Sequence, residues 1–194
     1  MRRAAAAIAL AALLLAGCTV AVSEGDAEVS CTLGEDTVFI LVAQAVPLAT
    51  LVPCILEFPA GWSYGGSDVR RGLARYWLSS DRAGVRSVEI ALSPSCDVTG
   101  LDERMDPVGE LGVRVFQEPL SYQPYAANRY FVFEGGCVAY RWRFTDGAEE
   151  APNLAYEAVA AMTFLPRAHL VRFVDQEVGL TLCGAEAPPC IGGT

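Results

Sequence analysis

The chain contains no lysine and only one histidine, His169, in 194 residues. All 14 basic residues are arginine, and this bias, together with abundant alanine, is typical of a genome rich in G and C. One histidine cannot build the histidine-rich sites typical of zinc. A Ser-His-Asp triad would need His169 as its base, and no Gly-x-Ser-x-Gly sequence accompanies it. We therefore expect His169 to be a surface or boundary residue of a helix.

Other motifs with a known chemical mechanism are also missing. The sequence has no phosphate-binding P-loop, no dinucleotide-binding glycine motif, no C-x-x-C pair and no EF-hand spacing. The net charge of −9 argues against nucleic acid as a partner. We therefore expect no cofactor and no metal, and the patterns favour a non-catalytic protein over an enzyme.

The first eighteen residues are the most informative segment that is present. Arg2 and Arg3 precede an apolar run at 4–15, which is too short to span a bilayer. Small residues then lead directly to Cys18. This layout is typical of a secretory signal, and a cysteine at the cleavage point is typical of a bacterial lipoprotein. We predict a signal peptide at 1–17, a lipid anchor on Cys18 and a location on the extracytoplasmic face of the cell membrane.

Six further cysteines follow Cys18, and an even number in an exported chain indicates disulfides rather than a metal site. Six cysteines allow fifteen pairings, so the sequence does not settle the connectivity. Cys183 and Cys190 are the most readily joined, because Gly184 and the prolines at 188–189 let this short segment turn back. The other pairs that we favour are Cys31–Cys54 and Cys96–Cys137.

Residues 18–30 are small and acidic and predict a tether, followed by a single domain at 31–194. Alternation of apolar and polar residues predicts antiparallel strands in the first part of this domain. Gly65-Gly66 is expected to mark a loop, and the apolar run at 38–46 fits a strand or a short helix. The expected strands are 71–79 paired with 85–93, a single strand at 113–118, and 129–133 paired with 138–145.

Helical periodicity replaces this alternation near the C-terminus. The apolar stripe of the first expected helix consists of Leu154, Ala158, Ala161, Met162 and Leu165. Asn153 is a suitable N-cap for that helix. Pro166 ends it and opens a second helix, for which Gly179 is a suitable stop. The prediction is an α+β fold in which an antiparallel sheet carries two C-terminal helices packed on one face and is stapled by disulfides.

Arginines gather on the predicted hairpins and form the candidate binding surface. If the outer faces of the hairpins adjoin, these guanidinium groups make a basic patch that could hold a carboxylate or phosphate through paired hydrogen bonds. The alternative is a solvated face on which the arginines pair with Asp68, Asp81 and Glu89. The candidate binding residues are Arg75, Arg82, Arg86, Arg141 and Arg143.

Carboxylates crowd the loop that follows the first hairpin, at Asp97, Asp102, Glu103, Asp106 and Glu110. A glycosidase needs two carboxylates that face each other at a set separation. An envelope hydrolase that uses a carboxylate pair from this 97–110 loop is therefore the alternative function. A solvated acidic loop is the simpler interpretation.

Short blocks of turn residues and cysteines, each different from the others, are distributed across residues 46–192. They are VPC at 52–54, PAGW at 59–62, SDRAG at 80–84, SCD at 95–97, GGC at 135–137, LCG at 182–184 and APPC at 187–190. In these blocks the chain resembles exported actinobacterial lipoproteins of unknown function, and the resemblance carries no catalytic residue. Residues 58–62 are also similar to the Pro-x-Gly-Trp turn of PsbP-like and LpqN-type lipoproteins, which implies an α+β sandwich that acts mostly through protein partners.

Taken together, these patterns predict a lipid-anchored binding or accessory protein of the cell envelope. It would contact an envelope protein or an anionic ligand through the arginine-bearing face of its sheet.

Overall fold

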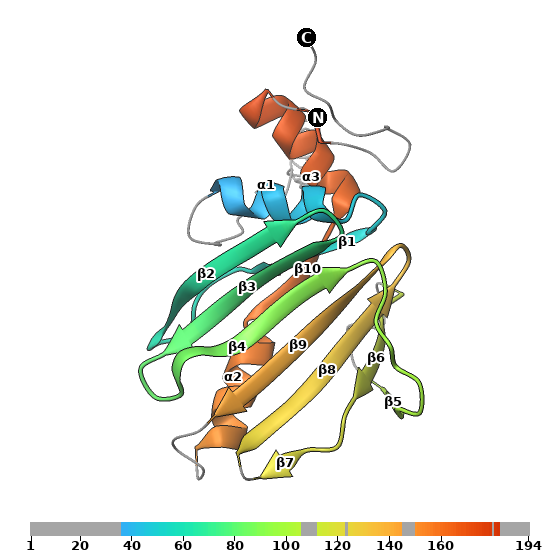
Figure 1. Ribbon diagram of the computed structural model, residues 1–194. Coiled ribbons are helices and arrows are strands. Elements are labelled where there is room, and N and C mark those ends of the chain that lie inside the picture. The colour runs from blue at the N-terminus through green and yellow to red at the C-terminus, as the bar shows by residue number, and fades with distance from the viewer. Residues whose placement is uncertain (1–35, 106–111, 123, 145–149, 180, 183–194) are drawn as a thin grey trace, which may run out of the picture.

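A computed structural model of the chain describes residues 36–105, 112–122, 124–144, 150–179 and 181–182. Its main element is an eight-stranded antiparallel sheet (Figure 1). The strands are β2 (Trp62–Arg70), β3 (Leu73–Ser80), β4 (Gly84–Ser93), β5 (Glu103–Arg104), β6 (Arg114–Gln117), β7 (Ser121–Tyr122), β8 (Tyr125–Phe133) and β9 (Gly136–Phe144). They run in the order β2-β3-β4-β9-β8-β6-β5, and β7 pairs with β8. The predicted α+β class and antiparallel sheet are confirmed.

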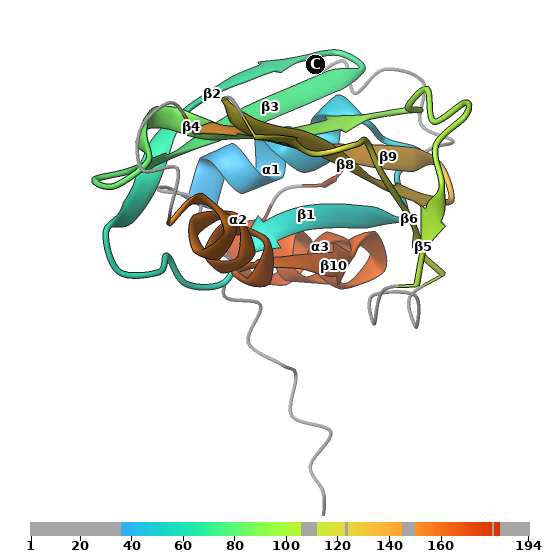
Figure 2. The same ribbon diagram turned by 90° about the horizontal axis from the view of Figure 1, so that it is seen from below.

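A second layer lies against one side of this sheet. Its elements are α1 (Asp36–Ala45), β1 (Leu51–Ile55), α2 (Ala151–Ala160), β10 (Met162–Pro166), α3 (Arg167–Phe173) and a π-helical turn (Val174–Val178). Strands β1 and β10 pair with each other as a separate antiparallel ribbon. Figure 2 shows the three helices and this ribbon on the same side of the large sheet. We call that side the inner face and the opposite side the outer face.

Strand β9 shows how alternation builds the core. Val138, Tyr140, Trp142 and Phe144 are all buried on the inner face, as their spacing predicts. The Tyr140 hydroxyl donates a hydrogen bond of 2.6 Å to the Ala158 carbonyl oxygen and so joins the sheet to α2. Burial raises the pKa of Tyr140 well above its usual value, so this donor stays protonated.

The two predicted hairpins are confirmed as β3–β4 and β8–β9, although β8 begins at Tyr125, earlier than expected. The prediction of a loop at Gly65-Gly66 is wrong. Both glycines lie inside β2, at a bulge where the register against β3 shifts between Tyr64 and Ser67. Gly66 has a φ of +109°, which glycine adopts without strain, so the pair bends the strand and does not end it.

The apolar run at 38–46, which the sequence left undecided, is helical and forms most of α1. The first C-terminal helix is shorter than predicted, because it ends at Ala160 and Met162 and Leu165 belong to β10. The helix ends early because a strand from elsewhere in the sequence pairs with the residues that follow it. Strand β1 supplies a partner whose backbone groups pair with those of β10, with Val52 opposite Leu165. The expected stop at Gly179 is confirmed by its left-handed φ of 67°.

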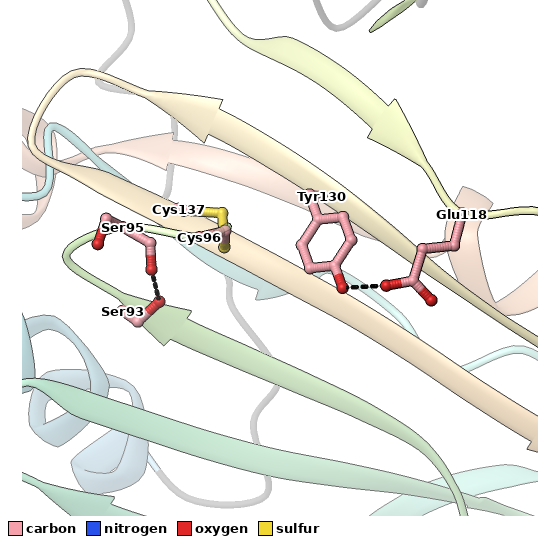
Figure 3. The surroundings of a disulfide bond; sticks show 6 residues. All are labelled: Ser93, Ser95, Cys96, Glu118, Tyr130 and Cys137. Carbon is pink, nitrogen blue, oxygen red and sulfur yellow. Dashed lines mark hydrogen bonds between the residues drawn. A yellow bond between two sulfur atoms is a disulfide. The ribbon is translucent and has the colours of Figure 1, made fainter. Parts of the chain in front are cut away.

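The predicted disulfide between Cys96 and Cys137 is confirmed (Figure 3). Cys54 is also disulfide-bonded. The other predicted disulfide cysteines (Cys31, Cys183 and Cys190), the predicted signal peptide, the tether and Cys18 lie outside the described residues. Over the part of the chain that is described, no helix is both long and apolar enough to cross a membrane.

Candidate functional site

The outer face of the large sheet is divided into a covered half and an open half. The covered half is a small apolar cluster made by Ala91, Phe116, Tyr130, Cys137 and Ala139. The segment at 94–105 packs over it through Cys96, Val98 and Leu101. The Cys96–Cys137 disulfide fixes this segment to β9, as Figure 3 shows. This half is therefore not available to a partner.

The open half carries a concavity of about 490 Å³. Its lining comes from β3, β4, β8, β9 and the chain between β6 and β8. Arg86, Arg141 and Arg143 contribute positive charge to the lining, and Glu89 and Glu118 contribute negative charge. Three of the predicted binding arginines thus meet around one hollow.

Five residues at one edge of this concavity form a transverse line, which we call the polar row. In order across the strands they are Trp77, Glu89, Arg141, Asn128 and Glu118. Cross-strand register places Trp77 opposite Glu89, Glu89 opposite Arg141, and Arg141 opposite Asn128. A backbone hydrogen bond of 2.9 Å from the Glu118 amide to the Asn128 carbonyl extends the line to the end of β6.

Side-chain hydrogen bonds hold the polar row at both ends. Glu89 accepts a bond of 3.1 Å from Trp77 Nε1 and one of 2.5 Å from Arg141 Nη1. At the other end, Glu118 accepts a hydrogen bond of 2.8 Å from Asn128 Nδ2. It also accepts one of 2.5 Å from the Tyr130 hydroxyl, which Figure 3 shows. Burial and the Glu118 hydrogen bond raise the pKa of Tyr130. Tyr130 thereby connects the open half to the covered half.

Small residues create the hollow beside the polar row. Ser87 and Ala126 line it, and Arg143 stands opposite Ala126 in the β8–β9 register. Both side chains are short, whereas Arg86 and Arg143 line the same concavity with long side chains. The concavity therefore follows from a local alternation of long and short side chains across three strands.

The arginines of the outer face differ in how far they are neutralised. Arg75 pairs with Asp68 at 2.5 Å, and this hydrogen bond raises the pKa of Arg75. Arg86 donates from Nε to the Gly65 carbonyl oxygen at 3.1 Å and lies 4.8 Å from the centroid of the Trp77 ring, as a cation–π partner.

Arg143 is the exception among these side chains. It is exposed and lines the concavity, and within the described residues it has no hydrogen-bond or ion-pair partner. Its guanidinium is consequently available to an incoming anion.

Arg82, the fifth predicted binding residue, lies elsewhere. It sits in the turn between β3 and β4 and pairs with Glu157 of α2 at 2.5 Å. Glu157 also accepts a hydrogen bond of 3.1 Å from Trp62 Nε1. The Arg82 hydrogen bond, followed by that of Trp62, holds the pKa of Glu157 below its usual value. Arg82 thus attaches α2 to the hairpin and contributes nothing to the outer face.

The alternative interpretation of the arginines, as ion-paired surface residues, holds for three of them. Arg75 pairs with Asp68, Arg141 with Glu89, and Arg82 approaches Asp81 at 3.8 Å as well as Glu157. Sequence reasoning missed Ser87, Asn128 and Glu118 as parts of the site. Their common signal, a polar residue facing outward, is too general to have selected them.

In the described part of the acidic loop, two carboxylates already have hydrogen-bond or ion-pair partners. Asp97 accepts the Thr99 amide at 3.0 Å, which lowers the pKa of Asp97. Glu103 pairs with Arg114 at 2.8 Å, which lowers the pKa of Glu103. Asp102 is exposed, and Asp106 and Glu110 lie outside the described residues.

His169 is exposed on α3, at a surface position as expected. Among the residues that the structure describes, no three histidine, cysteine, aspartate or glutamate side chains are grouped so as to hold a metal ion.

Comparisons with protein-family models, with curated proteins and with solved structures gave no match.

Proposed function

We propose that this chain is a lipid-anchored binding or accessory protein on the extracytoplasmic face of the cell envelope. It contacts an envelope protein or an anionic ligand through the open half of its outer face. The observation that carries the proposal is the guanidinium of Arg143, which lines a concavity of about 490 Å³ and has no partner among the residues that the structure describes. On a chain with a net charge of −9, an arginine without a counter-ion in the described residues is an unusual local feature beside a hollow.

The surroundings of Arg143 favour binding over a merely solvated charge. The polar row is fixed by hydrogen bonds at both ends, so little side-chain freedom is lost when a ligand arrives. We also infer that the two C-terminal helices pack on the inner face only, which leaves the open half uncovered. The non-catalytic character of the proposal rests on the same geometry, because each carboxylate of the polar row already accepts two hydrogen bonds.

The anchor is the second part of the proposal and rests on the signal that ends at Cys18. Two or three acyl chains hold a protein stably at a membrane. The intact mass of protein extracted from its native membrane tests this directly. We expect a diacylglycerol adduct in the natural chain and none in Cys18→Ser, which should be released from the membrane fraction. An unmodified, membrane-free natural chain would contradict the anchor.

Site-specific crosslinking in the native envelope tests the binding role. Tyr122 is 71% exposed and adjoins Ser121, which lines the concavity, so a photoreactive residue at 122 samples the mouth of the site. We expect a discrete adduct that is lost in Arg143→Glu. Arg70→Glu is the matched control, because Arg70 is also an exposed arginine but lies on edge strand β2, outside the concavity lining. An adduct that is equally strong in Arg143→Glu sinks the proposal.

A further inference from the structure

We infer that the group recognised in the concavity is a single carboxylate, and that Arg143 binds it through a pair of hydrogen bonds. This inference rests on the proposed function, because it specifies the ligand chemistry of the same surface. Four features of the open half support it: the charge balance, the shape of the free donor, a second unused polar group, and the state of the tryptophan ring.

The charge balance favours a monoanion. The charged side chains that line the concavity are Arg86, Arg141, Arg143, Glu89 and Glu118, which leave one positive charge in excess. Arg141 and Glu89 already neutralise each other at 2.5 Å. A single carboxylate would cancel the remaining charge. A phosphate carrying up to two negative charges would place an excess anion beside Glu89 and Glu118, where like charges repel.

The free donor has a shape that suits a carboxylate. A guanidinium presents its N–H groups as a rigid planar fork, which matches the two oxygens of a carboxylate. Within the described residues, Arg143 uses none of these donors. Arg86, by contrast, is held by the Gly65 carbonyl and by the Trp77 ring. We therefore expect it to attract an anion through its positive charge more than through hydrogen bonds.

Ser87 provides a second group suited to the same ligand. Its Oγ is buried and has no hydrogen-bond partner in the described part of the chain, and Ser87 lines the concavity. A buried hydroxyl without a partner is uncommon, because hydroxyl groups lose hydration when they are buried. A carboxylate held by Arg143 offers oxygen acceptors that such a hydroxyl can use.

The tryptophans argue against a sugar ring as the main recognised group. Trp77 is the only tryptophan in the polar row, and its ring has Arg86 at 4.8 Å and Arg75 at 5.8 Å from the centroid. Trp62 is buried at 6% exposure and Trp142 at 5%. The stacking surface that a neutral glycan needs is therefore already occupied among the described tryptophans. The carboxylate itself can belong to a peptide or to an acidic sugar.

Titration of the full lipidated chain in detergent micelles, observed through the arginine Nε–H NMR signals, tests the inference. The probes are N-acetyl-alanyl-alanine, its C-terminal amide, glucuronate and inorganic phosphate. We expect the free-acid peptide to shift the Arg143 signal with a Kd on the order of millimolar, and the amide to leave it unchanged. Glucuronate binding at least as tightly as the peptide supports the carboxylate and assigns its source to a sugar. Tighter binding of the peptide assigns its source to a peptide.

Variants separate recognition from general damage. Arg143→Ala should weaken peptide binding by about tenfold or more, Arg143→Lys should recover only part of this loss, and Arg70→Ala should change nothing. Ser87→Ala should weaken binding by about threefold. Unchanged affinity in Ser87→Ala overturns the role of that hydroxyl.

The remaining outcomes distinguish this inference from the proposed function. Phosphate binding tighter than either carboxylate, or equal binding of the amidated peptide, overturns the carboxylate assignment. If no probe binds while the crosslink at position 122 still depends on Arg143, the inference fails and the binding function stands. If the crosslink is also independent of Arg143, both fail.

Discussion

The covered and open halves of the outer face are built on the same strands and yet have opposite characters. Strand β9 contributes Cys137 and Ala139 to the covered half, both almost fully buried, and the exposed Arg141 and Arg143 to the open half. The change occurs between one outward position and the next. Outward orientation alone therefore does not make a residue a surface residue; what decides is whether another segment crosses over it.

Removing the disulfide should have the largest effect on this comparison. Cys96 and Cys137 are separated by 41 residues, and closing a loop of that size stabilises a fold by about 4 kcal/mol in the chain-entropy model. We expect Cys96→Ala/Cys137→Ala to lose most of that amount in urea denaturation. Ser95→Ala, beside the bridge, is the control. A loss below about 1 kcal/mol would show that the covering segment stays in place by packing alone.

Truncating the apolar cluster beneath the covering segment is the next largest change. Phe116 is 6% exposed, and Phe116→Ala should cost about 3 kcal/mol through lost contacts and a cavity. Val85, at 84% exposure in the β3–β4 hairpin, is the matched apolar control, and Val85→Ala should cost less than about 0.5 kcal/mol. Similar losses in the two variants would mean that the covered half is not a true core.

Glu157 tests the separation of Arg82 from the outer face. Glu157→Gln should cost about 1 kcal/mol at pH 7, because it weakens the hydrogen bonds from Arg82 and Trp62. The folded-state pKa of Glu157 lies below the ordinary value of 4.5. Its contribution is therefore complete above that pH and is lost as the pH falls through the folded-state value.

Thermal unfolding at pH 7 and pH 3 measures this dependence. The stability gap between the natural chain and Glu157→Gln should be clear at pH 7 and should shrink at pH 3. Glu57→Gln, at an exposed position, is the control. A stability gap that widens when the pH is lowered would contradict the predicted pH dependence.

The smallest expected effect on stability is that of Arg143→Ala. An exposed side chain without a partner in the described residues should change the free energy of unfolding by no more than about 0.5 kcal/mol. The same variant should weaken carboxylate binding by about tenfold or more, so we expect this arginine to matter for binding and not for stability. A marked loss of stability in Arg143→Ala would show that this arginine supports the fold.

The sequence predicted the parts of the fold that depend on local patterns. Alternation along 138–145 identified the buried side of β9, and the β3–β4 hairpin followed from its turn at 81–84. It misplaced β10, because an apolar stripe at helical spacing says nothing of a distant strand such as β1 that can pair with the same residues. Gly65-Gly66 wrongly predicts a loop for a related reason, because glycine is favoured both in loops and at β-bulges.

The candidate site was only partly predictable. Four of the five proposed arginines do lie on the outer face, and strand periodicity predicts this for Arg75, Arg141 and Arg143. Arg86 has a positive φ of 51° near an irregular end of the β3–β4 pairing, so its place beside Trp77 does not follow from periodicity. Arg82 belongs to a turn, where periodicity ends and the ion pair with Glu157 depends on tertiary packing. Predicting the polar row would require the register between neighbouring strands and the position of Glu118 beyond β6. That register cannot be deduced from a single sequence.

The segment at 94–105 also determines how much of the sheet a ligand can reach. The same strands continue beneath it, so the boundary of the proposed binding surface is set by this connecting segment and not by the sheet. A shorter connection would expose Ala91, Phe116 and Ala139 and add an apolar floor to a polar hollow. We therefore expect insertions or deletions in this one connection to change which ligands the proposed site accepts, without any change in the sheet.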